Sequence, residues 1–562
     1  MKKKQLLLGD EAIALGAINA GITGVYAYPG TPSTEITEYI QNSPQGRGGD
    51  IFCRWCTNEK TALEAALGVS YVGRRSIVCM KHVGLNVAAD PFMNGAMTGT
   101  NGGLIVVVAD DPSMHSSQGE QDSRFYGKFA LVPTLEPSSQ QEAYDMMEYG
   151  FRLSEEKGEP VLMRITTRMA HSRAVVEYDD AVAEKKPLSF PKDPSSWILL
   201  PVNARRRYPQ LIETYNALEQ ESDSSPYNRY YEGDDHSTGI IASGIAYNYL
   251  RENVGDECRC PILKISQYPM PRKLIRRLAA ECDRILVIEE GQPFIEEQVA
   301  GVLPQAAGPE GLFQEVLAGV GSLLSDSGRQ NRGCKIEGRL TGALPRVGEL
   351  TPDCVRAALS LEPHEVKAPA QNVVPRPPAL CQGCGHRDLY NALNEVMEQY
   401  SNSRVFSDIG CYTLGALPPF RSICSCVDMG AAITMTKGAA DAGYFPAVGV
   451  IGDSTFAHSG ITGLLDVANC NANVLIIISD NETTGMTGGQ DSAGTGKIEK
   501  ICEAVGIAPE HVNVVVPLPK NMEQIKQLIK SEIEYEGPSV LISRRECIQT
   551  AKRHAAARRA GN

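Results

Sequence analysis

The sequence predicts an α/β protein built from doubly wound parallel sheets in three units. Short apolar runs such as 104–108 and 474–478 have the length and composition of strands that are buried on both faces. Helical stretches alternate with these runs, which is the chain order of βαβ units. Turns rich in Gly, Pro and Asp directly follow several of the strands. Because ligands bind at the carboxyl ends of strands in open parallel sheets, we expect the functional residues in those turns.

The composition is that of a large folded protein that does not bind nucleic acid. The 562 residues carry 54 Lys and Arg against 67 Asp and Glu, a formal net charge of −13. Nucleic-acid binding requires a clustered basic surface, and the only such cluster is the tail after Arg544. No apolar run approaches the roughly 20 residues of a membrane-spanning helix. Asp10 and Glu11 interrupt the Lys-rich and Leu-rich start before it resembles a signal peptide, so we expect a cytoplasmic protein with reduced cysteines.

The first α/β unit is expected over residues 1–180. In it, Asp10 can cap the first helix and Gly21 can end that helix. Strands are expected at 25–28, 104–109 and 161–165. The first strand runs into the turn Pro29-Gly30-Thr31-Pro32 and the second into Asp110-Asp111-Pro112, so both turns are candidate positions for polar functional groups.

The remaining chain is expected to form two further α/β units with linkers. Weak periodicity and recurring prolines mark the linkers, and apolar strands mark the units. The predicted segments are a connecting region with some helix at 181–236, a middle α/β unit at 237–345, a linker at 346–380, a last α/β unit at 381–549 and a basic tail at 550–562.

The most specific motif lies in the last unit. Gly452-Asp453-Ser454 follows one apolar strand, and Asp480-Asn481-Glu482-Thr483 follows the next strand about thirty residues later. A Mg²⁺ ion that holds a diphosphate needs hard oxygen ligands, and two such loops can supply a carboxylate, an amide oxygen and a backbone carbonyl. Asp453, Asn481 and the carbonyl of Thr483 fit these roles, and Gly485 lets backbone N–H groups approach a phosphate.

This arrangement resembles the Gly-Asp-Gly to Asn-Asn signature of thiamine-diphosphate enzymes, with Ser454 in place of the second Gly. The run Thr487-Gly488-Gly489-Gln490 resembles the 2-oxoacid:ferredoxin oxidoreductases in particular. Within that family, four strings are similar to the alpha subunits of indolepyruvate:ferredoxin oxidoreductases: YPGTPS at 28–33, NEK at 58–60, MKHVGLN at 80–86 and DIGCY at 408–412.

The resemblance covers most of the chain and implies its cofactor and its three units. These would be a pyrimidine-binding unit, a middle unit similar to the C-terminal domain of transketolase, and a diphosphate-binding unit. The implied cofactors are thiamine diphosphate and Mg²⁺. The residues implied to bind them are Gly452, Asp453, Ser454, Asn481, Thr483, Gly485, Met486 and Thr487.

Five catalytic side chains are implied in the first unit. By resemblance, Glu59 is the carboxylate that hydrogen-bonds the aminopyrimidine ring and activates the cofactor. Thr31 resembles the threonine that meets the substrate carboxylate. Lys81, His82 and Asn86 could supply cationic and N–H partners to a 2-oxoacid, or could be ordinary polar residues of a loop. Further candidates are Arg124 as an anion binder and His458 beside the metal loop.

The cysteines fall into two classes. Cys381 and Cys384 form a C-x-x-C pair, and in the family this pair joins single cysteines that match Cys411 and Cys547 to hold one [4Fe–4S] cluster near the thiamine. A C-x-x-C pair alone could equally be a zinc site or core thiols. The remaining pairs suit a cluster poorly and are expected to be buried thiols: Cys53 with Cys56, Cys258 with Cys260, and Cys424 with Cys426.

The function implied by the resemblance is oxidative decarboxylation of an aryl 2-oxoacid, such as indolepyruvate, to the acyl thioester of coenzyme A. A small beta subunit would complete a heterodimer or a dimer of heterodimers. The family's alpha subunit usually continues into a ferredoxin module, and no such cysteine run occurs here. Electrons would then pass from the cluster to a separate ferredoxin-type acceptor, or the protein transfers none.

Two alternatives use the same residues differently. A non-oxidative thiamine-dependent decarboxylase or carboligase would need the diphosphate site but no cluster. A catalytically silent scaffold would retain only the fold, and the joint presence of Glu59, Asp453 and Asn481 argues against that reading.

Overall fold

The computed structural model shows an α/β protein with two compact units. One unit forms within residues 1–54 and 59–367, and the other within 55–58 and 368–562. None of the described helices is both long enough and apolar enough to cross a membrane. The described residues are 2–191, 193–255, 258–301, 334–365, 368, 370–374 and 377–560.

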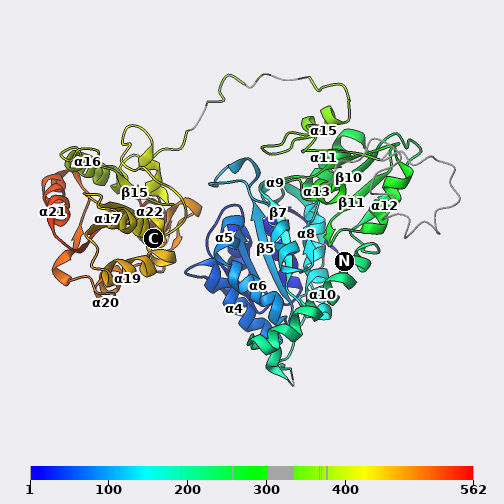
Figure 1. Ribbon diagram of the computed structural model, residues 1–562, viewed down its shortest axis with the longest axis horizontal. Coiled ribbons are helices and arrows are strands. Elements are labelled where there is room, and N and C mark those ends of the chain that lie inside the picture. Colours follow the sequence, from blue (N-terminus) through cyan, green and yellow to red (C-terminus); the bar gives the residue numbers. More distant parts are fainter. Residues whose placement is uncertain are drawn as a thin grey trace. The chain divides into compact units, whose positions relative to one another are not determined.

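A seven-stranded sheet forms the centre of the first unit (Figure 1). Its three central strands, at 76–81, 104–110 and 161–166, pair in parallel and are buried throughout, as the apolar run at 104–108 predicted. Figure 1 shows α4 and α6 on one side of this sheet and α8 on the other, the doubly wound arrangement. In spatial order its strands are β12 (Gln267–Tyr268), β6 (Thr134–Leu135), β7 (Val161–Thr166), β5 (Leu104–Asp110), β4 (Ser76–Lys81), β2 (Gly24–Ala27) and β3 (Phe52–Trp55).

The helices around the seven-stranded sheet alternate with its strands along the chain. A small antiparallel ribbon of β1 (Lys3–Leu8) and β8 (Arg173–Tyr178) lies outside the main sheet. The helices are α1 (Gly9–Asn19), α2 (Thr34–Asn42), α3 (Pro44–Arg47), α4 (Glu59–Tyr71), α5 (His82–Val87), α6 (Ala89–Thr98), α7 (Arg124–Ala130), α8 (Gln140–Lys157), α9 (Thr167–His171) and α10 (Pro201–Ser222).

The register of the seven-stranded sheet brings its candidate site residues together. Lys81 pairs with Ala109 across β4 and β5, and Asp110 pairs with Thr166 across β5 and β7. The turn after Asp110 and the start of α5 at His82 therefore leave the sheet at the same edge.

A five-stranded sheet forms the second layer of the first unit. After Ile265 the chain leaves this sheet and forms β12, which pairs with β6 of the larger sheet, so the two sheets are directly connected along the chain. Its strands, in spatial order, are β14 (Lys335–Glu337), β13 (Arg284–Ile288), β10 (Gly239–Ser243), β11 (Ile262–Ile265) and β9 (Arg229–Tyr231), and its helices are α11 (Gly244–Val254), α12 (Arg272–Glu281), α13 (Phe294–Ala300) and α15 (Pro352–Ala358).

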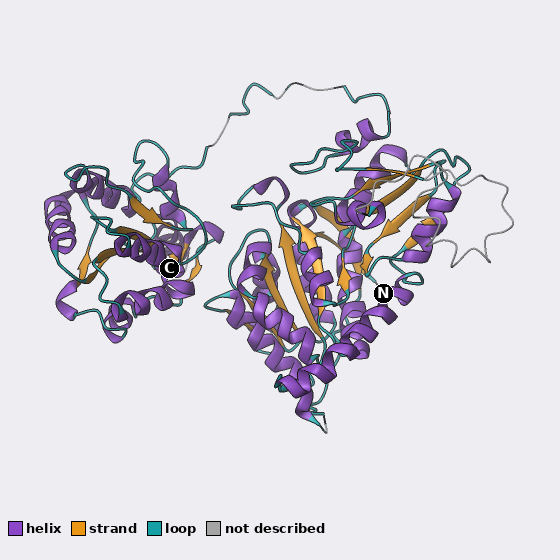
Figure 2. Cartoon of the chain, viewed as in Figure 1, coloured by secondary structure: helices purple, strands orange, loops and turns teal. Residues whose placement is uncertain are grey.

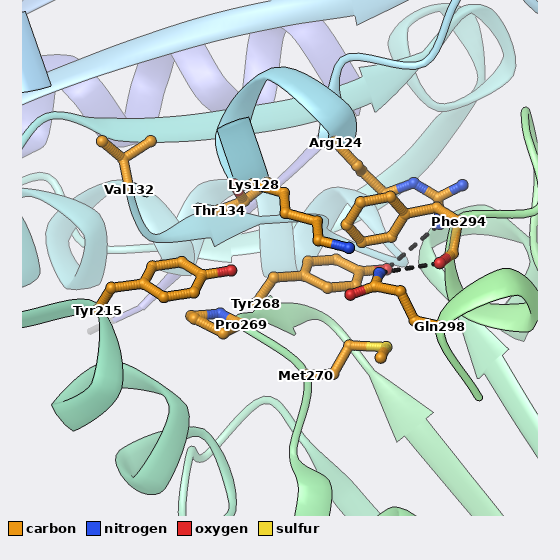
Figure 3. A pocket seen from close by; sticks show the side chains of 10 residues that line it. All are labelled: Arg124, Lys128, Val132, Thr134, Tyr215, Tyr268, Pro269, Met270, Phe294 and Gln298. Carbon is orange, nitrogen blue, oxygen red and sulfur yellow. Dashed lines mark hydrogen bonds between the residues drawn. The ribbon is translucent and has the colours of Figure 1, made fainter. Parts of the chain in front are cut away.

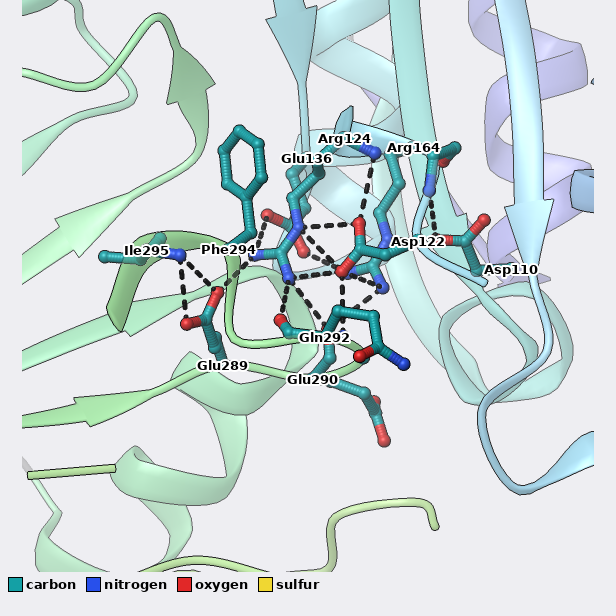
Figure 4. Close-up of polar contacts among 12 residues, drawn as sticks. Asp110, Asp122, Arg124, Glu136, Arg164, Glu289, Glu290, Gln292, Phe294 and Ile295 are labelled. Carbon is teal, nitrogen blue, oxygen red and sulfur yellow. Dashed lines mark hydrogen bonds and ion pairs between the residues drawn. The ribbon is translucent and has the colours of Figure 1, made fainter. Parts of the chain in front are cut away.

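Buried ion pairs connect these two sheets (Figure 4). Arg124 and Arg164 are fully buried, and their guanidinium groups lie among carboxylates from both layers. Arg164 Nε donates to Asp110 Oδ2 at 2.7 Å, and Arg124 Nη1 lies 2.9 Å from Glu289 Oε2 at the end of β13. Glu136 accepts from Arg164 and from the hydroxyl of Tyr268, the latter at 2.6 Å. Because each of these charges depends on its partners, the junction tolerates little rearrangement.

The second unit contains a five-stranded, wholly parallel sheet between helices (Figure 2). Its strands, in spatial order, are β15 (Val405–Ser407), β16 (Val448–Gly452), β17 (Val474–Asp480), β21 (Pro538–Arg544) and β20 (Val512–Val515). The helices and a short hairpin are α16 (Gly385–Met397), α17 (Ala431–Asp441), α18 (Asp453–Thr455), α19 (Ile461–Asn469), β18 (Thr483–Thr484), β19 (Gln490–Asp491), α20 (Ile498–Ala504), α21 (Met522–Glu534) and α22 (Ile548–Ala560).

Alternate residues of β17 face two different hydrophobic clusters. Leu475 and Ile477 pack with α16 and α21, whereas Ile476 and Ile478 pack with α17 and α19. This period of two explains why the strand reads as one continuous apolar run in the sequence. The prediction of an α/β fold with parallel sheets is confirmed.

The predicted capping role of Asp10 is wrong. Helix α1 begins at Gly9 with Leu8 as its N-cap, and Asp10 lies inside the first turn. The backbone N–H of Leu8 donates to Glu11 Oε2 at 2.8 Å, so the following residue forms the capping bond. Gly21 has a φ of +74° just after the helix, a left-handed conformation that favours glycine.

We predict that Arg164→Met strongly destabilises the first unit. The substitution would remove the cation that pairs with buried Asp110 and would leave Glu136 with the more distant Arg124, at 3.7 Å. Breaking a buried ion pair by removing one partner costs about 3–5 kcal/mol. Thermal unfolding followed by circular dichroism should show a midpoint lowered by several degrees. The matched control is Arg277→Met, which removes ion pairs to Glu232 and Glu281 on the surface and should cost no more than about 1 kcal/mol. Equal midpoints for both variants would contradict a structural role for the buried ion pairs.

Candidate functional site

Two loops at one edge of the second unit's sheet carry the predicted diphosphate residues. Parallel pairing of β16 with β17 sets Gly452 opposite Ser479, so Asp453 and Asn481 leave adjacent strands at the same end. Asp453 is 2% exposed, and its Oδ2 has no hydrogen-bond partner among the described residues. Asp480, by contrast, accepts from Arg544 Nε at 2.6 Å. Burial, and then the neighbouring Asp480, raise the pKa of Asp453 to about 7, so this buried oxygen fits a bound cation.

The hairpin after Asn481 packs against the first loop. The hydroxyls of Ser454 and Thr484 lie 2.8 Å apart and join the loops. Asn481 Oδ1 accepts from the N–H of Thr483 at 3.2 Å. Thr487 Oγ1 donates to Gln490 Oε1 at 2.6 Å. These hydrogen bonds therefore stabilise the hairpin and join it to the first loop. The side chain of Met486, between the two strands of the hairpin, is 58% exposed to solvent.

One cavity of the second unit is lined by all four cysteines predicted to bind a cluster. The cavity is about 90 Å³ in volume, and Cys381, Cys384, Cys411 and Cys547 all contribute to its wall. Burial and, after it, the three neighbouring thiols raise the pKa of Cys411 to about 12. Four sulfur atoms around one cavity match the donor set of an iron–sulfur cluster or another thiophilic metal centre.

The same cavity also touches the diphosphate loops. Asp480, Asn481 and Gly485 line it beside the cysteines. A Cβ atom added to Gly485 would lie 3.2 Å from Cys411 Sγ, so the hairpin backbone approaches this sulfur closely. The candidate metal-diphosphate site and the four thiols are therefore neighbours within one unit.

Tyr412 connects the Cys411 loop to the Asp453 loop. Its ring lies so close to Gly452 that a Cβ atom there would be 2.5 Å from it. Its hydroxyl donates to Asp408, which also accepts from the N–H groups of Gly430 and Ala432 at 2.9 and 3.1 Å. The position of the cysteine is thus fixed by a buried carboxylate at the end of the adjacent strand β15.

Two polar residues beside the cysteines were not predicted from the sequence. His386 is buried, and its Nδ1 lies 2.6 Å from Ser479 Oγ at the end of β17. Gln549 Nε2 donates to Cys381 Sγ at 3.5 Å. Each stands two residues after a predicted cluster cysteine, and that short spacing was the signal available in the sequence.

The expectation that the other cysteine pairs are buried is wrong. Cys424 and Cys426 are exposed, and the other four are only partly buried: Cys53, Cys56, Cys258 and Cys260. Except for Cys53 in the edge strand β3, these thiols lie in loops, where neighbouring elements cover them incompletely.

In the first unit, Lys81 and His82 lie at the junction of β4 and α5. Lys81 Nζ donates to the carbonyl of Ser116 at 2.7 Å and lies 3.9 Å from Asp111 Oδ2. Burial lowers the pKa of Lys81 to about 8, against the opposing effect of Asp111. His82 Nε2 lies 3.1 Å from the carbonyl of Gly119, and its buried Nδ1 has no hydrogen-bond partner among the described residues.

Three more predicted residues lie around this junction. Asn86 donates to Gln121 Oε1 at 3.0 Å and accepts from the hydroxyl of Tyr126 at 2.7 Å. Thr31 follows Gly30, where an added Cβ atom would lie 3.4 Å from Cβ of Lys81. The polar turn that follows β2 therefore approaches the end of β4.

Glu59 begins α4, is 5% exposed and lies against Gly84 of α5. A Cβ atom on Gly84 would lie 2.6 Å from both Cγ and Oε1 of Glu59. Only a glycine at this position leaves space for the carboxylate as it lies here. Gly84, like His386 and Gln549, was thus assigned no role from the sequence.

Arg124 is not the anion binder that the sequence suggested. Its guanidinium is fully buried, and its Nε donates to Asp122 Oδ1 at 2.9 Å. The cavity beside it is only about 10 Å³, too small for an organic substrate (Figure 3). Carboxylates from distant parts of the sequence, among them Glu289, already neutralise this side chain. His458, the other additional candidate, is buried within the second unit, and its Nδ1 lies 2.7 Å from Ser459 Oγ.

Comparison with known proteins gives the family. Residues 408–543 match the thiamine pyrophosphate enzyme, C-terminal TPP-binding domain. Residues 15–223 match the thiamine-diphosphate-binding domain of pyruvate flavodoxin/ferredoxin oxidoreductases. A 2-oxoglutarate:ferredoxin oxidoreductase structure from Magnetococcus marinus aligns with 64% of this chain and 65% of that chain, at 17% identity and a TM-score of 0.47.

Two curated relatives extend over almost the whole sequence. The indolepyruvate oxidoreductase subunit IorA of Archaeoglobus fulgidus is 37% identical over 97% of this chain and 86% of its own length. The subunit IorA of Pyrococcus horikoshii is 38% identical over 97% of this chain and 86% of its own. The chain therefore belongs to the family of indolepyruvate oxidoreductase IorA subunits, and it carries two thiamine-diphosphate-binding domains.

Proposed function

We propose that this chain is the thiamine-diphosphate-bearing subunit of an oxidoreductase that decarboxylates an aryl 2-oxoacid, such as indolepyruvate, to its coenzyme A thioester. The two electrons released would leave one at a time through a [4Fe–4S] cluster to a ferredoxin-type acceptor. The observation that carries this proposal is the cavity that four cysteines share with Asn481 and Gly485 of the diphosphate loops. A non-oxidative decarboxylase has no chemical need for four thiols at that position.

Asp453, Asn481 and the carbonyl of Thr483 would hold Mg²⁺ and, through it, the diphosphate. The buried oxygen of Asp453 that lacks a hydrogen-bond partner supports this role, as does the shared edge from which both loops leave. The surrounding contacts would come from Gly452, Ser454, Gly485, Met486 and Thr487. When bound, thiamine diphosphate supplies an electron sink for the bond that breaks as carbon dioxide departs.

Glu59 would exchange a proton with the aminopyrimidine ring. Its burial and the close backbone of Gly84 restrict the carboxylate to a narrow range of positions, which supports a role that depends on geometry. Thr31, Lys81, His82 and Asn86 would bind the 2-oxoacid. Among them, Lys81 supplies the positive charge that a substrate carboxylate requires.

Cys381, Cys384, Cys411 and Cys547 would bind the cluster as thiolates. Gln549 donates to Cys381, and a hydrogen bond to a coordinating sulfur is one of the features that set a cluster's reduction potential. His386 would support the adjacent strand end through Ser479.

A small beta subunit and a separate electron acceptor would complete the enzyme. Similarity to IorA subunits, whose name denotes one component of a multi-subunit oxidoreductase, supports the first partner. The form expected in the cytoplasm is a dimer of heterodimers. Coenzyme A would accept the acyl group, and a ferredoxin would accept the electrons.

The proposal is tested by anaerobic visible spectroscopy of the full chain with its beta subunit. We expect iron and acid-labile sulfide in the purified protein, and bleaching of the cluster absorbance on addition of an aryl 2-oxoacid with coenzyme A, thiamine diphosphate and Mg²⁺. Cys411→Ser should abolish the absorbance. The matched control Cys470→Ser changes an exposed thiol outside the cavity and should leave the spectrum unchanged. A colourless protein that still decarboxylates the acid would instead support the non-oxidative alternative.

We predict that Gly84→Ala impairs catalysis by displacing Glu59. The new methyl group would overlap the carboxylate, and misplacement of a reacting group by about 1 Å can cost on the order of 100-fold in rate. Steady-state assays at saturating thiamine diphosphate should show this loss in kcat. Gly68→Ala is the control, since it lies in α4 with open space around its Cβ position. If both variants kept wild-type kcat, the close contact would have no role in catalysis.

We predict that kcat/KM for the 2-oxoacid falls about tenfold per pH unit above a pH of about 8. Burial lowers the pKa of Lys81 to about 8, so its ammonium is present below that pH and lost above it. Hydrogen bonds led by that of Ser117 keep the pKa of Asp111 low against the effect of burial, so Asp111 stays ionised throughout. Burial lowers the pKa of His82, which is therefore neutral there. Lys81→Met should have low kcat/KM at every pH and lose this decline, whereas an unchanged profile would exclude Lys81 as its origin.

A further inference from the structure

Three side chains from three helices of the first unit form a compact cluster with nitrogen and oxygen donors. Asp10 lies in α1, Glu35 in α2 and His171 at the end of α9. One ligating atom from each lies within 4.8 Å of the other two. Glu35 Oε2 and His171 Nε2 are 3.6 Å apart. None of these residues belongs to the thiamine or cysteine sites proposed above.

Asp10 is the deepest member of this cluster. Its side chain is fully buried, and neither carboxylate oxygen has a hydrogen-bond partner among the described residues. Glu11, rather than Asp10, bonds the free N–H at the start of α1. Burial of an unpaired carboxylate is strongly unfavourable, so Asp10 requires either a proton or a cation.

The other two side chains connect the buried carboxylate to the surface. The side chains of Glu35 and His171 are 38% and 34% exposed. Their facing atoms, Glu35 Oε2 and His171 Nε2, are nevertheless buried and make no hydrogen bond to the described residues. The donor atoms thus face inward while the partly exposed side chains leave an entry path, two of the properties expected of a metal site.

We propose that Asp10, Glu35 and His171 bind a divalent transition-metal cation of the Zn²⁺ type, with water completing its coordination. An imidazole beside two carboxylates suits Zn²⁺ better than Mg²⁺ or Ca²⁺, which prefer oxygen ligands alone. Bonds of about 2.0–2.2 Å would require the donors to close by about 1 Å. Glu35 and His171, the two partly exposed side chains, can make that adjustment while Asp10 stays in place.

The proposed ion would link the starts of two helices beside a functional turn. Helix α2 begins at Thr34, whose Oγ1 accepts from the N–H of Gly30 at 3.1 Å. A cation on Glu35 would therefore hold α2 to α1 and α9 four residues after Thr31. Its role would be structural, because no hydrogen bond or ion pair among the described residues links the cluster to Lys81 or His82.

The test is a Zn²⁺ titration by calorimetry, with Co²⁺ as a spectroscopic probe, on full-length chelator-treated protein. A Cys381→Ser, Cys384→Ser background with saturating Mg²⁺ and thiamine diphosphate removes competition from the other two candidate metal sites. We expect one equivalent of Zn²⁺ to bind and to raise the midpoint of thermal unfolding. Bound Co²⁺ should show d–d bands without the intense sulfur-to-metal transition of a thiolate site.

Two variants identify the ligands. Asp10→Asn and His171→Gln should each weaken Zn²⁺ binding at least about 10-fold, since even outer-shell partners of metal ligands are worth about 10- to 100-fold in affinity. His171 is partly exposed, so its variant remains informative if Asp10→Asn folds poorly. Glu38→Gln, one turn further along α2, is the matched control and should bind Zn²⁺ like the parent. Absence of Zn²⁺ binding in the parent, or parent-like affinity in both ligand variants, would mean that Asp10 is neutralised by a proton, and would overturn the proposal.

Discussion

Parallel pairing of β16 with β17 is the constraint on which the second unit's site depends. Their register brings Asp453 and Asn481 to one edge although about thirty residues separate them. The loop of Cys411 follows β15, the next strand of the same sheet, and Tyr412 packs against Gly452 at the start of the Asp453 loop. Loops that are distant in sequence therefore meet because the strands before them end together.

The sequence predicted those features that local pattern determines. Continuous apolar runs correctly indicated β5 and β17, since strands buried on both faces leave no alternation to read. The four cavity cysteines are spread over positions 381 to 547, and only family resemblance linked them before the structure was known. The contact between Glu59 and Gly84 had no sequence signal, because it depends on how α4 packs against α5.

The wrong predictions concern side chains whose partners are distant or compete locally. Arg124 reads as an anion binder in a loop, but Glu289 reaches it from the second sheet of the same unit. Asp10 occupies a plausible capping position, but Glu11 accepts the hydrogen bond from the N–H of Leu8, and Asp10 is buried inside the first turn. In both cases the local pattern identified a charged group correctly, and tertiary packing determined what neutralises it.

The cavity cysteines come from the two ends of the second unit's chain, Cys381 before its first helix and Cys547 after its last strand. An inorganic centre held by all four could therefore be completed only after Cys547 had been synthesised and β21, the strand before it, had joined the sheet. A polypeptide that ends before Cys547 would lack a complete set of sulfur donors. The topology thereby couples metal loading to the integrity of the finished subunit.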